Sequence, residues 1–200
     1  MHDSVFLYIR GSVMKRLLIV VVLLLAGCSG FRGDMHWEMP AFQYTDQSGE
    51  TVTLDNLAGT PFIAYMYFTN CTTVCPPMTM HMVDVQQAIQ QAGIERYAIV
   101  GFSVDPVRDQ PHVIDTYIKQ FPVVDLTKWH LLTGYEEADM TRFAAKAFKA
   151  IVKAGDDGQM IHATNFYLVD QAGVVRKTYD GYSNVPYQDI VSDLKNVQPK

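Results

Sequence analysis

The fold of this chain is restricted above all by an apolar run that ends in two closely spaced cysteines. Residues 61–68 (PFIAYMYF) are almost entirely apolar, and the run has the length of a strand that is buried on both faces. Cys71 and Cys75 follow it, and Pro76 opens a segment with helical spacing, where the missing N–H of proline is harmless. The sequence therefore predicts a buried strand that leads through a short loop with two thiols into a helix.

Strand-like and helix-like patterns alternate along the rest of the chain. We expect strands at 51–54, 97–104 and 129–132, and helices at 76–92, 111–120, 136–148 and 186–197. Hairpins are expected within 150–162, as an insertion, and within 165–179. Such alternation is typical of an α/β domain with a central mixed sheet flanked by helices, and 200 residues suit one domain.

Composition and charge exclude several classes of protein. With 48% hydrophobic and 18% charged residues, the chain does not have the composition of a disordered protein. Its formal net charge of −5 provides no basic surface, so we expect no nucleic-acid partner. Three cysteines are too few for a small fold held together by disulfides. Nothing in the sequence predicts an obligate interface, so we expect a monomer.

The N-terminal segment has the pattern of an export signal. Lys15 and Arg16 are followed by an unbroken apolar run at 17–26 and then by small residues. The run is too short for a membrane-spanning helix, which needs about 20 apolar residues. We therefore expect residues 1–27 to be a signal peptide, of which 1–13 read as an upstream start-site artefact.

The sequence Leu-Ala-Gly-Cys at 25–28 resembles a bacterial lipobox, in which the cysteine is acylated and begins the mature protein. The resemblance implies that Cys28 carries a lipid, that residues 28–39 form a tether and that residues 40–200 form the domain. Because the mature chain is acidic, the lipid has to supply attachment to the extracytoplasmic face of the cell membrane. Export also places Cys71 and Cys75 where disulfides can form.

The pair Cys71 and Cys75 can do two kinds of chemistry. Two thiols separated by three residues can close a small disulfide, or they can present two thiolates to one metal ion. The N-terminus of a helix lowers the pKa of a nearby thiol and so favours the thiolate, which is the reactive and ligating form. The alternative is that both cysteines are small buried hydrophobes, which is less typical of a turn that precedes a helix.

Three further motifs follow the dithiol along the chain. They are Ser103-Val104-Asp105-Pro106 with Arg108-Asp109-x-Pro111, then Leu132-Thr133-Gly134, then His162 shortly before the run 165–170 (NFYLVD). Together with Cys71-x-x-x-Cys75-Pro76, these motifs resemble the Sco/SenC family over residues 40–198. Members of that family are thioredoxin-fold copper proteins that help to assemble the copper A centre of cytochrome c oxidase. The resemblance implies a thioredoxin-like fold in which Cys71, Cys75 and His162 bind copper.

The chemistry of this donor set agrees with the resemblance. Two thiolates and one imidazole suit copper or zinc better than calcium or magnesium. In thioredoxin-like disulfide reductases a proline usually faces the dithiol, whereas the corresponding stretch 161–164 has no proline and carries His162. A lone histidine is more often structural, so the assignment of His162 depends on the motif match. Thr72 and Thr73 stand where many family members have a proline and an acidic residue. This difference affects copper affinity and redox poise rather than the ligands.

The resemblance implies a membrane-anchored copper metallochaperone whose partner is the copper A subunit of the oxidase. The alternative is a thiol–disulfide oxidoreductase, in which Cys71 and Cys75 are a redox dithiol that keeps the copper-ligand cysteines of the oxidase reduced. A thiol peroxidase has only the shared fold in its favour. A lipoprotein with an inert dithiol is the remaining alternative.

Other candidate residues have weaker support. Asp105 is expected in a loop at the same sheet edge as the dithiol, where it either tunes the charge near the metal or forms a turn before Pro106. Arg108 and Asp109 are predicted to fix that loop. His112 and His130 belong to no motif.

Methionines next to the dithiol and in the tether invite a copper-relay interpretation. Met78, Met82 and Val85 are spaced as one helix face, however, which favours core packing over a relay through Met80 and His81. The run 35–39 (MHWEM) has soft donors, but no copper site is assigned to it.

Overall fold

The structure is a computed structural model that describes residues 33–156 and 158–199. The predicted signal peptide, Cys28 and the first part of the predicted tether lie outside the described residues. In the part of the chain that is described, no helix has the length and the apolar character needed to cross a membrane.

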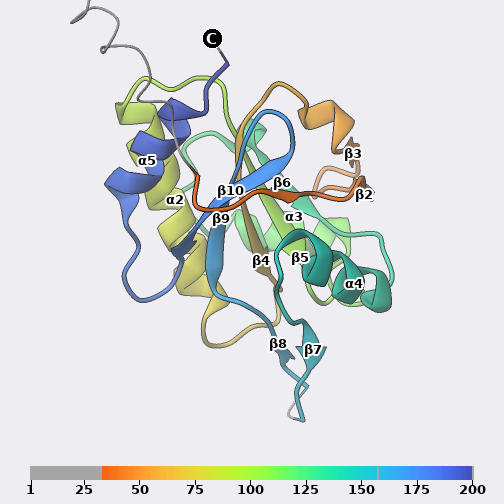
Figure 1. Cartoon of the computed structure of the whole chain (residues 1–200). Helices are drawn as coiled ribbons and strands as arrows, with labels where there is room; N and C mark the ends of the chain where they lie inside the picture. The colour runs from red at the N-terminus through yellow and green to blue at the C-terminus, as the bar shows by residue number, and fades with distance from the viewer. Residues whose placement is uncertain (1–32, 157, 200) are drawn as a thin grey trace, which may run out of the picture. The chain divides into compact units, whose positions relative to one another are not determined.

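A six-stranded mixed sheet forms the centre of the domain, in the order β1-β10-β9-β4-β5-β6 (Figure 1). Its parallel part consists of β4 (Phe62–Tyr67), β5 (Ala98–Ser103) and β6 (Trp129–Leu132). Its antiparallel part consists of β9 (Asn165–Val169), β10 (Val174–Asp180) and β1 (Trp37–Glu38). Every residue of β4 and β5 is buried, as expected of apolar strands that are covered on both faces.

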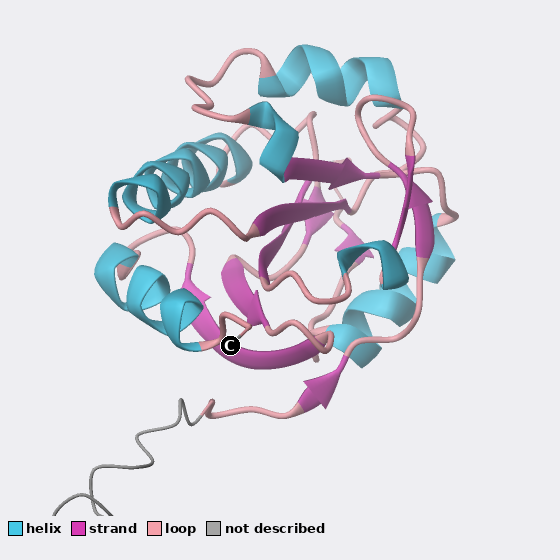
Figure 2. Cartoon of the chain, turned by 90° about the horizontal axis from the view of Figure 1, so that it is seen from above, coloured by secondary structure: helices cyan, strands magenta, loops and turns pink. Residues whose placement is uncertain are grey.

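Helices flank this sheet (Figure 2). They are α2 (Cys75–Gln91), α3 (Pro111–Ile118), α4 (Glu137–Ala147) and α5 (Tyr187–Asn196). Side chains of β4 alternate between the two faces of the sheet. Ala64 and Met66 belong to the core cluster that includes Phe143 of α4, whereas Tyr67 stacks against Tyr117 of α3. The predicted α/β class, with a mixed sheet flanked by helices, is confirmed.

Shorter elements complete the domain. Two single turns of 3-10 helix are η1 (Asp55–Leu57) and η2 (Leu126–Lys128). Two small antiparallel pairs are β2 (Gln43–Thr45) with β3 (Thr51–Thr53), and β7 (Lys153–Ala154) with β8 (Met160–Ile161). The second pair is the inserted hairpin that the sequence predicts.

Two differences between the structure and the predicted elements concern the surroundings of the site. The hairpin strand β7 begins at Lys153 rather than at residue 150: its pairing with β8 covers Lys153 and Ala154, and Ala150 and Val152 pack in the core instead. The strand β1 lies inside the segment 28–39 that was predicted as a tether: Trp37 pairs with Val175, and Met39 is buried. The sheet therefore includes residues that precede position 40.

Candidate metal centre

The dithiol loop lies at the carboxyl ends of the parallel strands β4 and β5, where α/β proteins commonly build their sites. β4 ends at Tyr67, Cys71 lies in the loop that follows, and Cys75 is the first residue of α2. Both cysteines are buried, and both are free thiols. The backbone N–H of Cys75 donates to Sγ of Cys71 over 3.3 Å. The first turn of the helix therefore binds the sulfur of Cys71.

His162 reaches the dithiol from the other end of the chain. It follows β8 and precedes β9, and β9 pairs with β4, so the sheet brings it beside the loop. Nε2 of His162 lies 3.3 Å from Sγ of Cys75. Nδ1 lies 2.9 Å from the carbonyl oxygen of Ala163, which can only accept, so Nδ1 carries the proton and Nε2 presents its lone pair. Burial lowers the pKa of His162, and this also favours the neutral, ligating imidazole.

Of the three predicted ligands, Cys75 is the one that contacts both of the others. The N–H of Cys75 donates to Sγ of Cys71, and Sγ of Cys75 lies 3.3 Å from Nε2 of His162. Among the described residues, no group of three or more His, Cys, Asp and Glu side chains is arranged to hold a metal ion. Cys75 is thus the shared neighbour of the other two residues, within a set of soft donors that suits copper or zinc.

The two thiols differ in their electrostatics. The pKa of Cys71 is lowered, first because the thiol of Cys75 donates to its sulfur and then because the N–H groups of Thr73, Val74 and Cys75 point at it, although burial opposes the effect. The pKa of Cys75 is raised, chiefly because its proton is bound by Cys71 and also because of burial. Cys71 is therefore the thiolate of the pair, and Cys75 keeps the proton.

The loop after β5 lies at the same edge of the sheet, as predicted. Asp105 is buried and forms an ion pair with Arg108 over 2.8 Å, and its backbone carbonyl accepts from the N–H of Asp109. Asp109 is fully buried and accepts hydrogen bonds from Thr69 and Ser103. The prediction that Arg108 and Asp109 fix this loop is confirmed.

The inserted hairpin contacts the dithiol loop and Arg108, and the sequence does not predict these contacts. Nε2 of Gln159 lies 3.3 Å from the carbonyl oxygen of Asn70, next to Cys71, and Nη1 of Arg108 lies 3.4 Å from the carbonyl oxygen of Gly158. The sequence predicts the hairpin itself, but these contacts join residues that lie 89 and 50 positions apart, so no local pattern reveals them.

Several of the other candidates in α2 make structural contacts. Met78, Met82 and Val85 are fully buried, so the predicted core face of α2 is confirmed. Nδ1 of His81 lies 2.6 Å from the hydroxyl of Tyr187, a contact that joins α2 to α5.

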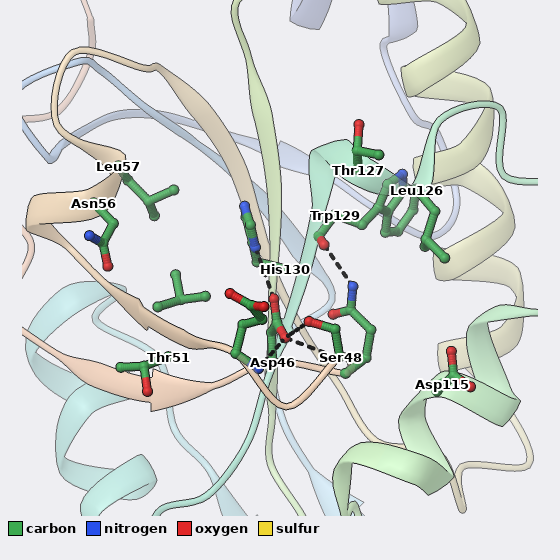
Figure 3. Close-up of a pocket in the computed structure, with 13 residues that line it drawn as sticks. Asp46, Ser48, Thr51, Asn56, Leu57, Asp115, Leu126, Thr127, Trp129 and His130 are labelled. Carbon is green, nitrogen blue, oxygen red and sulfur yellow. Dashed lines mark hydrogen bonds and ion pairs between the residues drawn. The ribbon is translucent and has the colours of Figure 1, made fainter.

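A cavity of about 640 Å³ lies away from the dithiol, beside the start of β6 (Figure 3). Asp46 lines it and lies 3.2 Å from Nδ1 of His130. Gln47 also lines it and binds the edge of β6, donating to the carbonyl of Trp129 over 2.8 Å and accepting from the N–H of Leu131 over 2.7 Å. The amide of Gln47 therefore satisfies backbone groups of an edge strand, whereas Asp46 contacts a side chain of that strand.

Comparison with known protein families shows a match that covers almost all of the described residues. Residues 34–198 match the family SCO1/SenC. The SCO1 protein homolog of Bacillus subtilis (strain 168) is 40% identical over 181 residues, which are 88% of this chain and 92% of the relative.

Solved structures of similar proteins have the same fold. A SCO1/SenC family lipoprotein from Bacillus anthracis str. Ames has a TM-score of 0.79 at 41% identity, covering 82% of this chain and 96% of that chain. BsSco has a TM-score of 0.77 at 41% identity, covering 83% and 96%; it is described as a member of the Sco family of cytochrome c oxidase assembly proteins, with a disulfide switch. ScoI of Bradyrhizobium japonicum with copper bound has a TM-score of 0.66 at 26% identity, covering 80% and 99%. The predicted thioredoxin-like fold is confirmed.

Proposed function

Because the chain belongs to the SCO1/SenC family, we propose that it is a membrane-anchored copper metallochaperone that helps to assemble the copper A centre of cytochrome c oxidase. Its partner is then the oxidase subunit that holds this centre. Support comes from BsSco, a member of a family of oxidase assembly proteins, and from ScoI, whose structure contains copper.

The observation that carries the proposal is the contact of Cys75 with both Cys71 and His162. Sγ of Cys75 lies 3.3 Å from Nε2 of His162, and its N–H lies 3.3 Å from Sγ of Cys71. Two sulfurs and a neutral imidazole nitrogen are soft and borderline donors that suit copper, the cargo, which passes to the client by exchange of ligands. A Cys71–Cys75 disulfide offers no thiolate, so the oxidised protein is the form that does not bind copper.

A thiol–disulfide reductase is the second candidate, and the asymmetry of the two thiols favours it. The thiolate of Cys71 attacks one sulfur of a client disulfide, forms a mixed disulfide and releases one client thiolate. Cys75 then gives its proton to the client thiolate that was released first, and its thiolate attacks the sulfur of Cys71, which releases the second client thiolate. The client gains two electrons, and the Cys71–Cys75 pair loses them as it closes into a disulfide.

Replacement of His162 by alanine separates the two candidates. We expect His162→Ala to weaken copper(I) binding by about 100-fold, because one of three donors is lost. The equilibrium of the dithiol with glutathione should change by less than about threefold, since both thiols remain. Anaerobic copper titration and glutathione exchange measure the two quantities.

The matched control is His130→Ala, which removes a histidine that binds Asp46 beside the distant cavity. Copper affinity of this variant should equal that of the wild type. Unchanged copper affinity in His162→Ala would remove His162 from the site. Oxidase assembly in cells that survives His162→Ala but not Cys71→Ala would make the reductase the function.

The anchor is a separate part of the proposal. We propose that Cys28 carries a lipid that holds the protein at the extracytoplasmic face of the membrane; a tether confines the encounter with a membrane-bound client to one surface. In Cys28→Ala, the protein should move from the membrane fraction to the soluble extracytoplasmic fraction, while its copper affinity stays that of the wild type. Cell fractionation and mass spectrometry of Cys28 measure this. Retention of the variant in the membrane contradicts the lipid anchor.

A further inference from the structure

Asp109 is a carboxylate that the protein encloses completely, with an exposed fraction of 0%. It lies after β5 in a turn that is closed by hydrogen bonds from the N–H groups of Arg108 and Asp109 to the carbonyl oxygen of Asp105. A buried charge is costly unless several donors bind it. The donors around Asp109 therefore indicate which parts of the chain this residue holds.

These donors come from two segments of the chain. Ser103, the last residue of β5, donates its hydroxyl to Oδ2 over 2.5 Å. Thr69 donates its hydroxyl to Oδ1 over 2.5 Å, and its backbone N–H lies 3.2 Å from both carboxylate oxygens. Thr69 stands two positions before Cys71. Asp109 thus joins the start of the dithiol loop to the end of the neighbouring strand.

We infer that Asp109 is a positioning residue for the metal centre: through Thr69, it holds the loop that presents Cys71. The start of α2 also binds this loop, through the N–H of Cys75 that donates to Sγ of Cys71 over 3.3 Å, and the other contacts of the loop backbone are longer than the 2.5 Å bond from Thr69 to Asp109. The N–H of Cys71 lies 3.4 Å from the carbonyl of Phe68, and the carbonyl of Asn70 lies 3.3 Å from Nε2 of Gln159. Groups that orient metal ligands typically change metal affinity by about 10- to 100-fold. The inference rests on the proposed copper binding and deepens it.

The alternative is that Asp109 only stabilises the fold, and the molecule contains a matched control for this. Asp46 is also buried, with an exposed fraction of 4%. It accepts hydrogen bonds from Ser48 and from the N–H of Glu50, and it contacts His130, beside the start of β6. Replacement of either aspartate by asparagine removes one acceptor oxygen and should lower the free energy of unfolding by a similar amount. Of the two residues, Asp109 is the one that binds the dithiol loop.

The experiment compares Asp109→Asn with Asp46→Asn in the reduced full-length protein. We expect Asp109→Asn to weaken copper(I) binding by about 10- to 100-fold and to shift the charge-transfer band between thiolate and copper(II). The dithiol–glutathione equilibrium should move about tenfold towards the disulfide, because Cys71 loses donors that stabilise its thiolate. Asp46→Asn should lose stability in urea to a similar extent and change none of these three quantities. Wild-type values for all three quantities in Asp109→Asn overturn the inference.

A second pair of variants keeps the test decisive if Asp109→Asn does not fold. Thr69→Val removes the hydroxyl donor but keeps the shape and the backbone N–H, and Thr69→Ser restores the hydroxyl. Weaker copper binding in Thr69→Val, with recovery in Thr69→Ser, supports the inference. Equal behaviour of the two variants overturns it, because the hydrogen bond to Asp109 would then have no effect on the site.

Failure of the inference differs from failure of the proposed function. A wild-type protein that binds no copper refutes the metallochaperone, and the dithiol–glutathione equilibrium of the same variants still decides whether Asp109 positions Cys71. A wild-type protein that binds copper, together with an Asp109→Asn variant that keeps the wild-type values of all three quantities, refutes the positioning role alone.

Discussion

Replacement of Cys75 by serine should abolish tight copper binding. Cys75 contacts both of the other predicted ligands, so its loss removes one donor and the contact that joins the remaining two. Zinc-finger sites gain roughly 10–16 kcal/mol from four ligands, about 3–4 kcal/mol for each, so the loss of a thiolate that also joins the other two donors should weaken binding by about a thousandfold. Serine does not ionise near neutral pH, so it does not replace the thiolate. Anaerobic competition with a copper(I) chelator measures the change.

Met82→Leu is the control for Cys75→Ser. Met82 lies in the same helix, is fully buried and carries the sulfur that a copper relay would use. Leucine has a similar volume, so the helix should stay packed. Wild-type affinity in Met82→Leu, beside the loss in Cys75→Ser, assigns copper to the dithiol. Equal losses in both variants would contradict the dithiol site and favour the relay.

Much of the architecture around this site follows from sequence patterns. The run at 61–68 predicts β4 because continuous apolar character over that length suits a strand covered on both faces. Two prolines after Cys75 predict the start of α2, since proline fits the first helical turn. The position of the dithiol at a strand–helix junction then follows from chain order alone.

Other features depend on contacts between distant segments. The strand β1 has two residues and belongs to the sheet because both of them pair with the distant strand β10, so no local periodicity reveals it. The sequence places Asp109 in a loop, but its bond to Thr69 spans 40 positions and needs the parallel pairing of β4 and β5. The free lone pair on Nε2 of His162 likewise depends on the carbonyl of Ala163, whose direction is set by the backbone.

The alkylation of Cys71 should be almost independent of pH near neutrality in the folded protein, in contrast to the unfolded chain. The pKa of Cys71 is lowered, first by the hydrogen bond from the thiol of Cys75 and then by backbone N–H groups. The thiolate therefore persists well below the pKa of an ordinary thiol, about 8.5. Between pH 6.5 and 8.5, the rate of reaction with iodoacetamide should change less than about twofold in the folded, copper-free protein, and about 50-fold in the unfolded chain. Mass spectrometry assigns the modified cysteine.

The lowered pKa of Cys71 also determines how the free energy of unfolding depends on pH. A folded-state pKa below that of the unfolded chain gives stability that is fully present above the unfolded pKa and is lost as the pH falls through the folded pKa. The free energy of unfolding of the reduced protein, relative to Cys71→Ala, should therefore decrease as the pH is lowered from 8 towards 5.

In Cys75→Ala the alkylation profile should shift towards that of an ordinary thiol without reaching it, because the backbone N–H groups of the helix start still bind the sulfur. A folded protein whose alkylation rises as steeply with pH as that of the unfolded chain would show that Cys71 is not the thiolate of the pair, and the reductase mechanism would then lose its nucleophile.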